Sequence, residues 1–306
     1  MKHLSFSKIY SFFKNIRLVI GIPYGWLLVF FFIPVLIILK ISFSKPIMAI
    51  PPFEELIRWS ESFDLEIRLH LSNYLTLVKD PFYGQAFLSS VVIAASSTML
   101  CLIIGYAMAY GMTRFSGITR IVCLMMVMLP FWTSFLVRVY AWLGLLSNGG
   151  IVNTVLLSMG LIREPLALLH NDIAVCIGIT YCYLPFMILP IFSSLDKLDP
   201  EYLEAAHDLG CSPLKAFWKV TVPLTKPGII AGCVLVFVPA LGEFVIPELL
   251  GGPDTLMIGR IIWNEFFNNR DWPVACALAV VLLLTFVAPI MAFQRRQLSK
   301  SFEEGA

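Results

Sequence analysis

The sequence predicts an all-α integral membrane protein with six transmembrane helices, and three observations lead to this fold class. Hydrophobic residues make up 58% of the 306 positions and charged residues only 14%, whereas a soluble domain carries roughly 25% charged residues. The apolar residues are gathered in six long runs, and most lysines and arginines lie between these runs. Because a bilayer core about 30 Å thick requires about 20 apolar residues in a helix, each run is long enough to span a membrane.

The predicted spans follow one another along the whole chain. They cover residues 19–41, 86–112, 121–146, 172–195, 227–250 and 274–294. Isolated prolines fall inside several of them, namely Pro34, Pro130, Pro185, Pro239 and Pro289. Such prolines are tolerated in membrane helices because neighbouring groups satisfy the freed backbone carbonyls.

The first run, 19–41, follows a basic segment that resembles the start of a signal peptide. The positive residues of that segment are Lys2, Lys8, Lys14 and Arg17. The run is too long for a signal peptide, however, and no small-residue cleavage site follows it. The sequence therefore favours a retained signal-anchor helix.

The distribution of lysine and arginine predicts the orientation. If the N-terminus is inside, the cytoplasmic segments carry more of these residues than the longer outer loops. Because cytoplasmic loops are enriched in positive residues, both termini are predicted to be cytoplasmic. The chain is interpreted as a single transmembrane domain over 1–306, and its segments outside the bilayer are the N-terminus 1–18, the outer loop 43–85, the cytoplasmic loop 196–226 and the tail 295–306.

The outer loop 43–85 is interpreted as an external cap without chemistry of its own. Its stretch 65–71 alternates apolar and polar residues, which indicates a short extended segment. The stretch 53–59 is expected to form an amphipathic helix. The second outer feature, 264–272, mixes aromatic and charged residues; it either contacts a binding protein or lies at the lipid headgroups, where tryptophan is common.

Composition also indicates which kinds of site to exclude. The net charge of +2 is too small to indicate nucleic acid as a partner. The seven cysteines show no CxxC pairing, and all except Cys211 lie in apolar runs, so they are expected to be small buried hydrophobes. The four histidines are scattered along the chain, and no metal site is expected.

The loop between the fourth and fifth predicted spans carries strong helix boundary signals. Asp199 is a good N-cap, and Pro200 suits the first helical position. Gly210 suits a left-handed cap at the end of this helix. Ser212 and Pro213 then give a second start signal. The pattern predicts two short helices at a sharp angle, joined by a glycine.

The same loop resembles the EAA loop of ABC importer permeases. The matching residues are Glu204-Ala205-Ala206, then Gly210, then Val220-Thr221-Val222-Pro223, where the family usually has Ile-x-Leu-Pro. In that family the loop helix docks into a groove on an ATPase subunit and transmits its motion. The resemblance implies that Glu204, Ala205, Ala206, Gly210 and Pro223 are ATPase-coupling residues. The alternative is an ordinary amphipathic loop helix.

Two further segments, 129–142 and 240–274, look like those of polyamine permeases of the spermidine/putrescine type, and the likeness extends over most of the chain. It is greatest to the first of the two permeases in bacterial putrescine importers. The resemblance implies a type I ABC importer permease fold in the bacterial inner membrane. It also implies a heterodimer with a second permease, two ATPase subunits that bind the ATP and Mg²⁺, and a periplasmic binding protein.

The absence of catalytic motifs agrees with a transport subunit that is not an enzyme. No GxxxxGK(S/T) phosphate loop occurs, and neither does a nucleophile elbow or an HExxH pair. No cofactor is expected on this chain. The alternatives are an ABC permease for another small organic solute, an ion-coupled secondary transporter, which should show paired broken helices, and a membrane-embedded enzyme.

Ionisable residues at membrane depth are functional candidates because they are expensive to bury. Arg138 lies in the third predicted span, and Glu243 and Glu248 lie in the fifth. One hypothesis is that both glutamates face the pathway and attract a diammonium substrate. Aromatic residues would then add cation–π contacts of about 0.5–2 kcal/mol each, and the candidates are Trp132, Tyr140 and Trp142.

A structural hypothesis competes with this one. Arg138 and Glu243 lie at similar depth, so they are also expected to form an intramembrane ion pair that only joins two spans, while Glu248 is simply solvated. The small residues of 228–232 predict close helix packing, with a pathway-lining face as the alternative.

Overall fold

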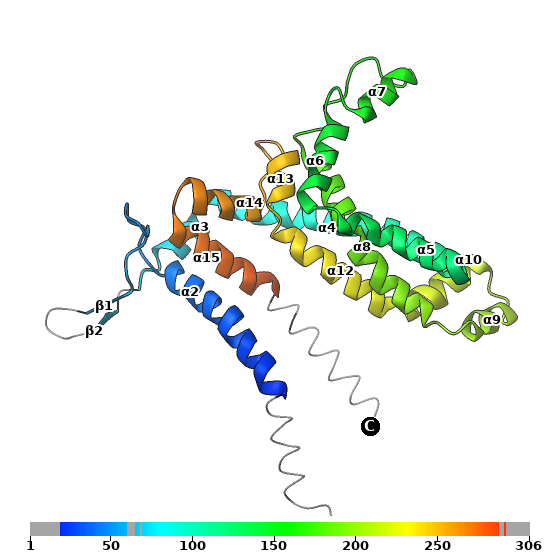
Figure 1. The fold of residues 1–306 in the computed structure, drawn as a ribbon, viewed down its shortest axis with the longest axis horizontal. Coiled ribbons are helices and arrows are strands. Elements are labelled where there is room, and N and C mark those ends of the chain that lie inside the picture. Colours follow the sequence, from blue (N-terminus) through cyan, green and yellow to red (C-terminus); the bar gives the residue numbers. More distant parts are fainter. Residues whose placement is uncertain (1–18, 60–64, 68, 288–290, 292–306) are drawn as a thin grey trace, which may run out of the picture. The chain divides into compact units, whose positions relative to one another are not determined.

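The computed structural model describes residues 19–59, 65–67, 69–287 and 291. The chain divides into two compact units (Figure 1). The first comprises Met1–Lys79 and Glu265–Thr285, and the second comprises Asp80–Asn264 and Phe286–Ala306. The predicted segments 1–18 and 295–306, together with the end of the sixth predicted span, lie outside the described residues.

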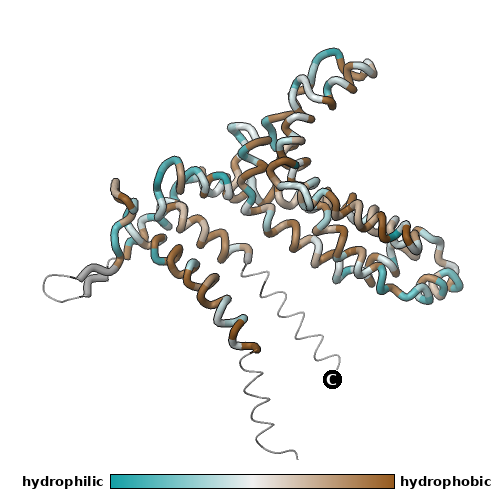
Figure 2. Tube along the Cα trace, viewed as in Figure 1, coloured by the Kyte–Doolittle hydropathy of each residue, from teal (hydrophilic) through white to brown (hydrophobic). Residues whose placement is uncertain are grey.

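The first unit contains the predicted signal-anchor helix. Val19–Ser42 is helical and apolar, with a π-helical stretch η1 (Leu28–Phe32) before α2 (Ile33–Ser42). Nearly all of its side chains before Ile41 are exposed, and hydrophobic colouring dominates it in Figure 2. α2 packs against α15 (Trp272–Leu282), which continues into η5 (Leu283–Val287).

Polar contacts fasten the end of α2 to α3 (Ser72–Lys79). The buried Asn73 donates through Nδ2 to the carbonyl oxygens of Ser42, at 2.9 Å, and of Ser44, at 2.8 Å. The hydroxyl groups of Ser42 and Tyr74 lie 2.8 Å apart. These bonds satisfy carbonyl groups that the end of a helix leaves without an intrahelical partner.

The outer loop contains a small hairpin. β1 (Ile57–Trp59) pairs antiparallel with β2 (Leu65–Ile67), with Ile57 opposite Ile67. The expected extended segment is therefore confirmed over 65–67, but the amphipathic helix expected over 53–59 is wrong. A helix this short is marginal in water, and pairing with β2 satisfies the backbone of β1 instead.

Three helices form the centre of the second unit. α4 (Pro81–Thr113) and α12 (Lys226–Leu241) both pack against α8 (Asp172–Asp196) and against each other. α4 begins earlier than the predicted 86 because Asp80 caps it, accepting a hydrogen bond from the Phe82 backbone N–H at 2.9 Å. α8 remains continuous through Pro185 and Pro190, in agreement with the expected tolerance of proline.

Small residues bring α12 close to α8. A Cβ on Gly228 would lie 2.6 Å from the Pro190 carbonyl oxygen, and a Cβ on Gly232 would lie 2.7 Å from the sulfur of Met187. No side chain fits at either position without a shift of the neighbour. The packing interpretation of 228–232 is therefore confirmed.

The third predicted span is not one continuous helix. α5 (Gly117–Met128) leads into a 3₁₀ turn, η2 (Leu129–Trp132), and the chain restarts as α6 (Phe135–Leu146) and α7 (Ile151–Ser158). Pro130 supplies no N–H donor, and the Thr133 hydroxyl donates to the Pro130 carbonyl oxygen at 2.7 Å. Local bonds thus replace the helical ladder, so the expectation of an uninterrupted helix over 121–146 is wrong.

The fifth predicted span also breaks. α12 ends at Leu241, and the short α13 (Val245–Leu250) begins after three intervening residues. α14 (Ile258–Trp263) approaches this break so closely that a Cβ on Gly259 would lie 2.3 Å from the Gly242 carbonyl oxygen. η4 (Asn264–Asn268) then follows α14 along the chain.

Within the described residues, four helices are long and apolar enough to cross a bilayer. They are Val19–Ser42, Pro81–Thr113, Phe135–Ser158 and Asp172–Asp196. A fifth is added if Pro213–Leu224 and Lys226–Leu241, which meet at 66°, count as one bent span; Gly117–Trp132 and Trp272–Phe286 are shorter apolar helices. The all-α class is confirmed apart from the small hairpin, and the number of six spans stays a prediction.

Candidate functional site

The first candidate region is the loop helix α9 (Glu201–Asp208), which the sequence predicts. As predicted, Asp199 caps its start, because its Oδ1 accepts a hydrogen bond from the Glu201 backbone N–H at 3.1 Å. Among the expected coupling residues, Ala206 is buried, whereas Glu204 and Ala205 are exposed. Ala206 thus packs against the protein, Ala205 is exposed, and Glu204 is exposed at the edge of a hollow beneath the helix.

Gly210 ends α9 in the left-handed conformation that the sequence predicts, with φ at +79°. The Cys211 N–H donates to the Ala206 carbonyl oxygen at 3.0 Å, and the Gly210 N–H donates to the His207 carbonyl oxygen at 2.8 Å. These two bonds form a Schellman motif. His207 adds a contact from its Nδ1 to the Cys211 carbonyl oxygen at 3.0 Å.

A second series of helical segments follows directly, so the two-helix prediction is confirmed. The segments are α10 (Pro213–Ala216), η3 (Phe217–Thr221) and α11 (Val222–Leu224). Pro223, the last expected coupling residue, lies in α11, two residues before the 66° bend at Thr225. The Thr225 hydroxyl donates to the Thr221 carbonyl oxygen at 2.8 Å and lies 3.0 Å from the Tyr106 hydroxyl of α4. The bend therefore lies within hydrogen-bond distance of α4.

A hollow of about 270 Å³ lies beneath α9. The end of α4 supplies Tyr110 and Arg114, and the Arg114 guanidinium lies 4.7 Å from the centre of the Tyr110 ring. Phe217 packs edge-on against Tyr110 at 5.3 Å. Aromatic and cationic side chains thus line the space between α9 and α4, and α9 packs against α10 and η3.

The second candidate region is at the break between α12 and α13. Glu243 is 7% exposed, and its Oε2 accepts a hydrogen bond from the Tyr183 hydroxyl at 2.5 Å. Its Oε1 accepts from the backbone N–H groups of Phe244, at 3.2 Å, and Val245, at 3.0 Å. A buried carboxylate is thus held by one hydroxyl and by the exposed N–H groups at the start of α13, where negative charge is favoured.

Arg138 does not form the expected direct ion pair with Glu243. It is 9% exposed on α6, and its guanidinium carbon lies 5.0 Å from the Phe131 ring centre and 5.6 Å from that of Phe135. Its Nε and Nη1 have no hydrogen-bond partner among the residues that the structure describes. Glu243 finds its donors at the helix break, and Arg138 instead finds the electron-rich faces of two rings.

The partner of Glu243 on α8 is Tyr183. Tyr183 was not among the residues expected from the sequence. The available signal was its hydroxyl inside an apolar run, because a buried tyrosine hydroxyl usually requires a partner.

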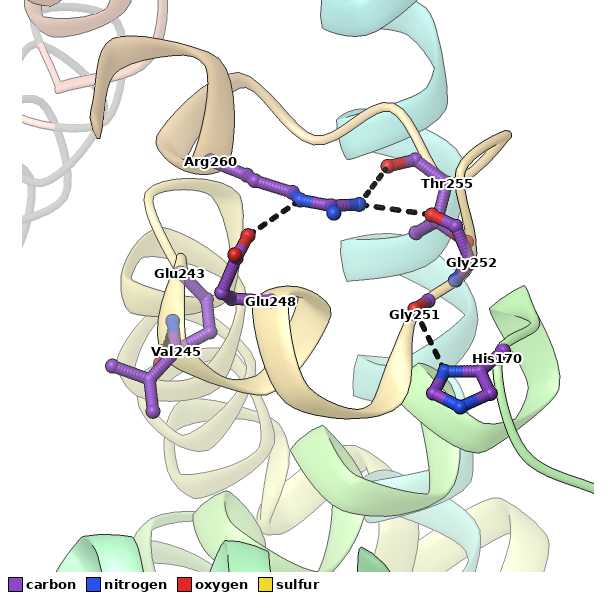
Figure 3. A network of polar contacts seen from close by, with 8 residues as sticks. All are labelled: His170, Glu243, Val245, Glu248, Gly251, Gly252, Thr255 and Arg260. Carbon is purple, nitrogen blue, oxygen red and sulfur yellow. Dashed lines mark hydrogen bonds and ion pairs between the residues drawn. The ribbon is translucent and has the colours of Figure 1, made fainter. Parts of the chain in front are cut away.

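Glu248 has a partner that the sequence did not suggest (Figure 3). Its Oε2 accepts from Nε of Arg260 at 2.7 Å, and Nη1 of Arg260 donates to the Gly252 carbonyl oxygen at 2.9 Å. Thr255 extends this cluster, since its hydroxyl donates to Oδ1 of Asp172 at 2.6 Å. Glu248 is exposed, as expected, but it is also paired with Arg260. This ion pair joins α13 to α14 across a loop, so the sequence spacing of the two residues does not predict it.

The aromatic candidates are not gathered around Glu243. Trp132 is 88% exposed and Tyr140 is 56% exposed. Trp142 packs edge-on against Tyr181 at 5.5 Å and borders the hydrophobic core.

The segment 264–272 packs against itself and against the loop after α2, where the Trp272 and Phe53 ring centres lie 6.1 Å apart. The indole of Trp272 stacks on Phe266 at 4.7 Å and donates to its carbonyl oxygen at 3.1 Å. Asp271 caps α15 by accepting from the Val274 backbone N–H at 3.1 Å. Burial raises the pKa of the Asp271 carboxyl above its usual value, and this backbone hydrogen bond partly opposes the shift. Whether the segment contacts a binding protein or lipid headgroups stays a prediction.

Comparison with known proteins defines the class of this chain. Residues 101–294 match the family described as "Binding-protein-dependent transport system inner membrane component". The chain belongs to this family and is a multi-pass permease component of the inner membrane, in agreement with the resemblance inferred from its EAA-like loop.

Individual relatives show which permeases of this family the chain is similar to. The chain is 38% identical over 279 residues to the "Spermidine/putrescine transport system permease protein PotB" of Haemophilus influenzae, covering 91% of this chain and 93% of that protein. It is 39% identical over 281 residues to the protein of the same name from Escherichia coli, covering 91% and 97%. A solved bacterial alginate ABC transporter, in complex with an alginate pentasaccharide-bound periplasmic protein, has the same fold, with a TM-score of 0.67 at 14% identity and 98% of each chain covered.

Proposed function

We propose that this chain is one of two permease subunits of an ATP-driven importer that carries putrescine, spermidine or a related polyamine into the cell. Relatives named for spermidine and putrescine transport, similar over about nine-tenths of the chain, support this cargo. Six spans would place both termini and α9 in the cytoplasm. Two separate ATPase subunits would hold the ATP and Mg²⁺. A periplasmic binding protein would deliver the cargo, by analogy with the alginate transporter, which forms a complex with an alginate-bound periplasmic protein.

The observation that carries the proposal is the geometry of the loop around Gly210. Glu204 and Ala205 of α9 are exposed, whereas Ala206 is buried. A carboxylate beside a small residue suits a surface that a partner must approach closely. The Schellman motif then fixes the direction in which the next segments leave. Docking of an ATPase on α9 would therefore move α9 and α10 together, as a lever, without changing the angle between them.

The motion has a continuous route to the membrane. α10, η3 and α11 lead to the bend at Thr225, and α12 leads from there to the break that holds Glu243. α12 has 16 residues, which corresponds to about 24 Å of helix. Displacement of α9 would therefore reposition Glu243 relative to Tyr183 and to the facing permease.

Glu243 is the best candidate in this chain for a weak site for an ammonium group. A carboxylate has about four acceptor positions, and the hydroxyl and two N–H groups occupy three of them. One position remains for a passing cation. The positive charge of Arg138 opposes tight binding, which suits a pathway that must release its cargo.

The test combines cargo and coupling. Uptake of labelled putrescine and spermidine is measured in cells that lack this chain and in the same cells after the chain is restored. An Ala205→Trp variant places an indole on the exposed face of α9, and Met159→Trp places the same group on an exposed residue of the loop after α7. Co-purification of the ATPase is measured for each.

We expect native and Met159→Trp chains to restore uptake and retain the ATPase, and Ala205→Trp to lose both while still reaching the membrane. Retention of the ATPase without uptake of either polyamine would refute the cargo alone. Normal uptake with Ala205→Trp would refute the coupling role of α9.

A further inference from the structure

An apolar groove runs along the outside of the second unit between α4 and α12. It consists of two adjoining hollows of about 410 and 360 Å³, which share Met99 and Leu102. The first hollow extends to Ala107 and Trp218, and the second extends to Ala95 and Phe237. We refer to these six residues as the α4–α12 groove.

The groove faces outward and has the length of one lipid chain. Met99 is 57% exposed, and the neighbouring Ile103 is 58% exposed, although both are apolar. From Ala95 to Ala107 the wall of α4 measures about 18 Å at 1.5 Å per residue. One leaflet of a hydrocarbon core about 30 Å thick is about 15 Å deep. A single acyl chain would therefore fill the groove from its polar end to the bilayer midplane.

Positive charge marks one end of the groove. Trp218 lies at this end and is 62% exposed, at the kind of position where tryptophan meets lipid headgroups. Lys215 precedes it by three residues and Lys219 follows it, so the three share a stretch of the helical segment from α10 to η3. Both lysines are exposed, and neither forms an ion pair with any residue that the structure describes.

We propose that the α4–α12 groove binds an anionic phospholipid of the cytoplasmic leaflet. One acyl chain lies in the groove, and Lys215 and Lys219 hold the phosphate and the anionic headgroup. Two ammonium groups without a carboxylate partner favour an anionic lipid over a zwitterionic one. The assignment of the leaflet rests on the cytoplasmic placement of α10 under the proposed function, whereas the preference for an anionic lipid does not.

The site lies where a lipid would influence transport. The groove is bordered by η3 and α11 on one side of the 66° bend and by α12 on the other. A lipid that contacts both sides restrains the bend through which α9 would move α12. Bound anionic lipid would thus stabilise one angle of the bend between α11 and α12. The lipid composition of the membrane would then regulate the permease.

The experiment measures lipid binding to the full chain, purified with its bound partner subunits, by native mass spectrometry. Phosphatidylglycerol and phosphatidylcholine with identical acyl chains are titrated separately. A lysine near a membrane surface contributes about 1 kcal/mol, or roughly a fivefold change in affinity. We expect phosphatidylglycerol to bind more tightly than phosphatidylcholine, with a roughly fivefold loss for Lys215→Gln or Lys219→Gln and roughly a thirtyfold loss for the double variant.

Two further variants keep the result interpretable. Lys197→Gln removes an exposed positive charge near the end of α8, away from the groove, and should change neither affinity. Ala107→Phe fills the groove but keeps both lysines, and it should weaken the binding of both lipids. Equal binding of the two lipids to the native chain, or unchanged phosphatidylglycerol binding in the double lysine variant, would overturn the proposal.

One more outcome would also overturn it. If Ala107→Cys crosslinks efficiently to the second permease, a protein segment rather than a lipid occupies the groove. The readout does not depend on uptake, so lipid binding without polyamine transport refutes only the proposed function. Polyamine transport without selective lipid binding refutes only this inference.

Discussion

The left-handed glycine at the end of α9 yields a graded prediction. Gly210 has φ at +79°, and a Cβ added there would meet no atom within 4 Å. Substitution is therefore penalised by backbone conformation alone, with no steric clash. Alanine in a left-handed conformation costs about 1–2 kcal/mol. Asparagine costs less because it tolerates this region, and a β-branched valine costs more than alanine because it is a genuine outlier there.

The conformational penalties at Gly210 should lower the efficiency with which ATP hydrolysis drives transport. A penalty of about 1.4 kcal/mol changes an equilibrium tenfold, so Gly210→Ala should lower the ratio of capped to uncapped loops by roughly five- to thirtyfold. The assay is transport per ATP hydrolysed, measured in proteoliposomes with the complete importer. We expect the order glycine, asparagine, alanine, valine from most to least efficient. Hydrogen exchange at the Gly210 and Cys211 amides should rise in the same order, because these N–H groups form the Schellman bonds.

Gly149 supplies a matched control. It also has open space around its Cβ position, but it is not in the left-handed region, so Gly149→Val should leave both readouts near those of the native chain. If Gly210→Val transports as efficiently per ATP as Gly210→Asn, the left-handed cap does not control coupling, and α9 does not act as a lever.

Three other perturbations test the remaining geometry. Glu243→Gln keeps the shape of the side chain and removes its charge, so polyamine uptake should fall while assembly with the second permease, measured by co-purification, persists; lost assembly would indicate a structural role. Gly228→Ala should lower the thermal unfolding temperature more than Gly232→Ala, because its Cβ meets a backbone oxygen at 2.6 Å, whereas the other meets the mobile end of a methionine at 2.7 Å; the opposite order would contradict the packing argument. Arg260→Gln removes the partly exposed ion pair with Glu248 and should change the free energy of unfolding by less than about 1 kcal/mol, and a larger loss in denaturant titration would show that its bonds to the loop carbonyls matter more than the ion pair.

The two short helices around Gly210 were predictable because their signals are local. Asp199 and Pro200 start a helix through capping and a fixed φ, and Gly210 ends it through the one conformation that glycine adopts readily. Each of these effects operates within a few residues, whatever the rest of the fold does. The order of the two short helices and the glycine between them could therefore be inferred from the sequence alone.

The breaks in the third and fifth spans were not predictable in this way. Pro130 and Pro185 look equivalent in an apolar run, yet α8 continues through Pro185 and the chain breaks near Pro130. α8 packs against both α4 and α12, and Pro185 is buried among them. The segment around Pro130 lies outside that centre, where bonds from Thr133 can replace the helical ladder. The difference depends on tertiary neighbours that the sequence does not reveal.

The expected pairing of Arg138 with Glu243 failed for the same reason, and its failure has a mechanistic consequence. Similar depth in two continuous helices would have favoured an ion pair, but the break after Leu241 gives Glu243 its own backbone donors. A closed ion pair would have to be broken before a cation could bind, at considerable expense in a low-dielectric interior. A carboxylate held by one hydroxyl and two N–H groups instead has one acceptor position free. Under the proposed function, the broken helix would let Glu243 exchange partners at the end of the helix that the coupling loop would move.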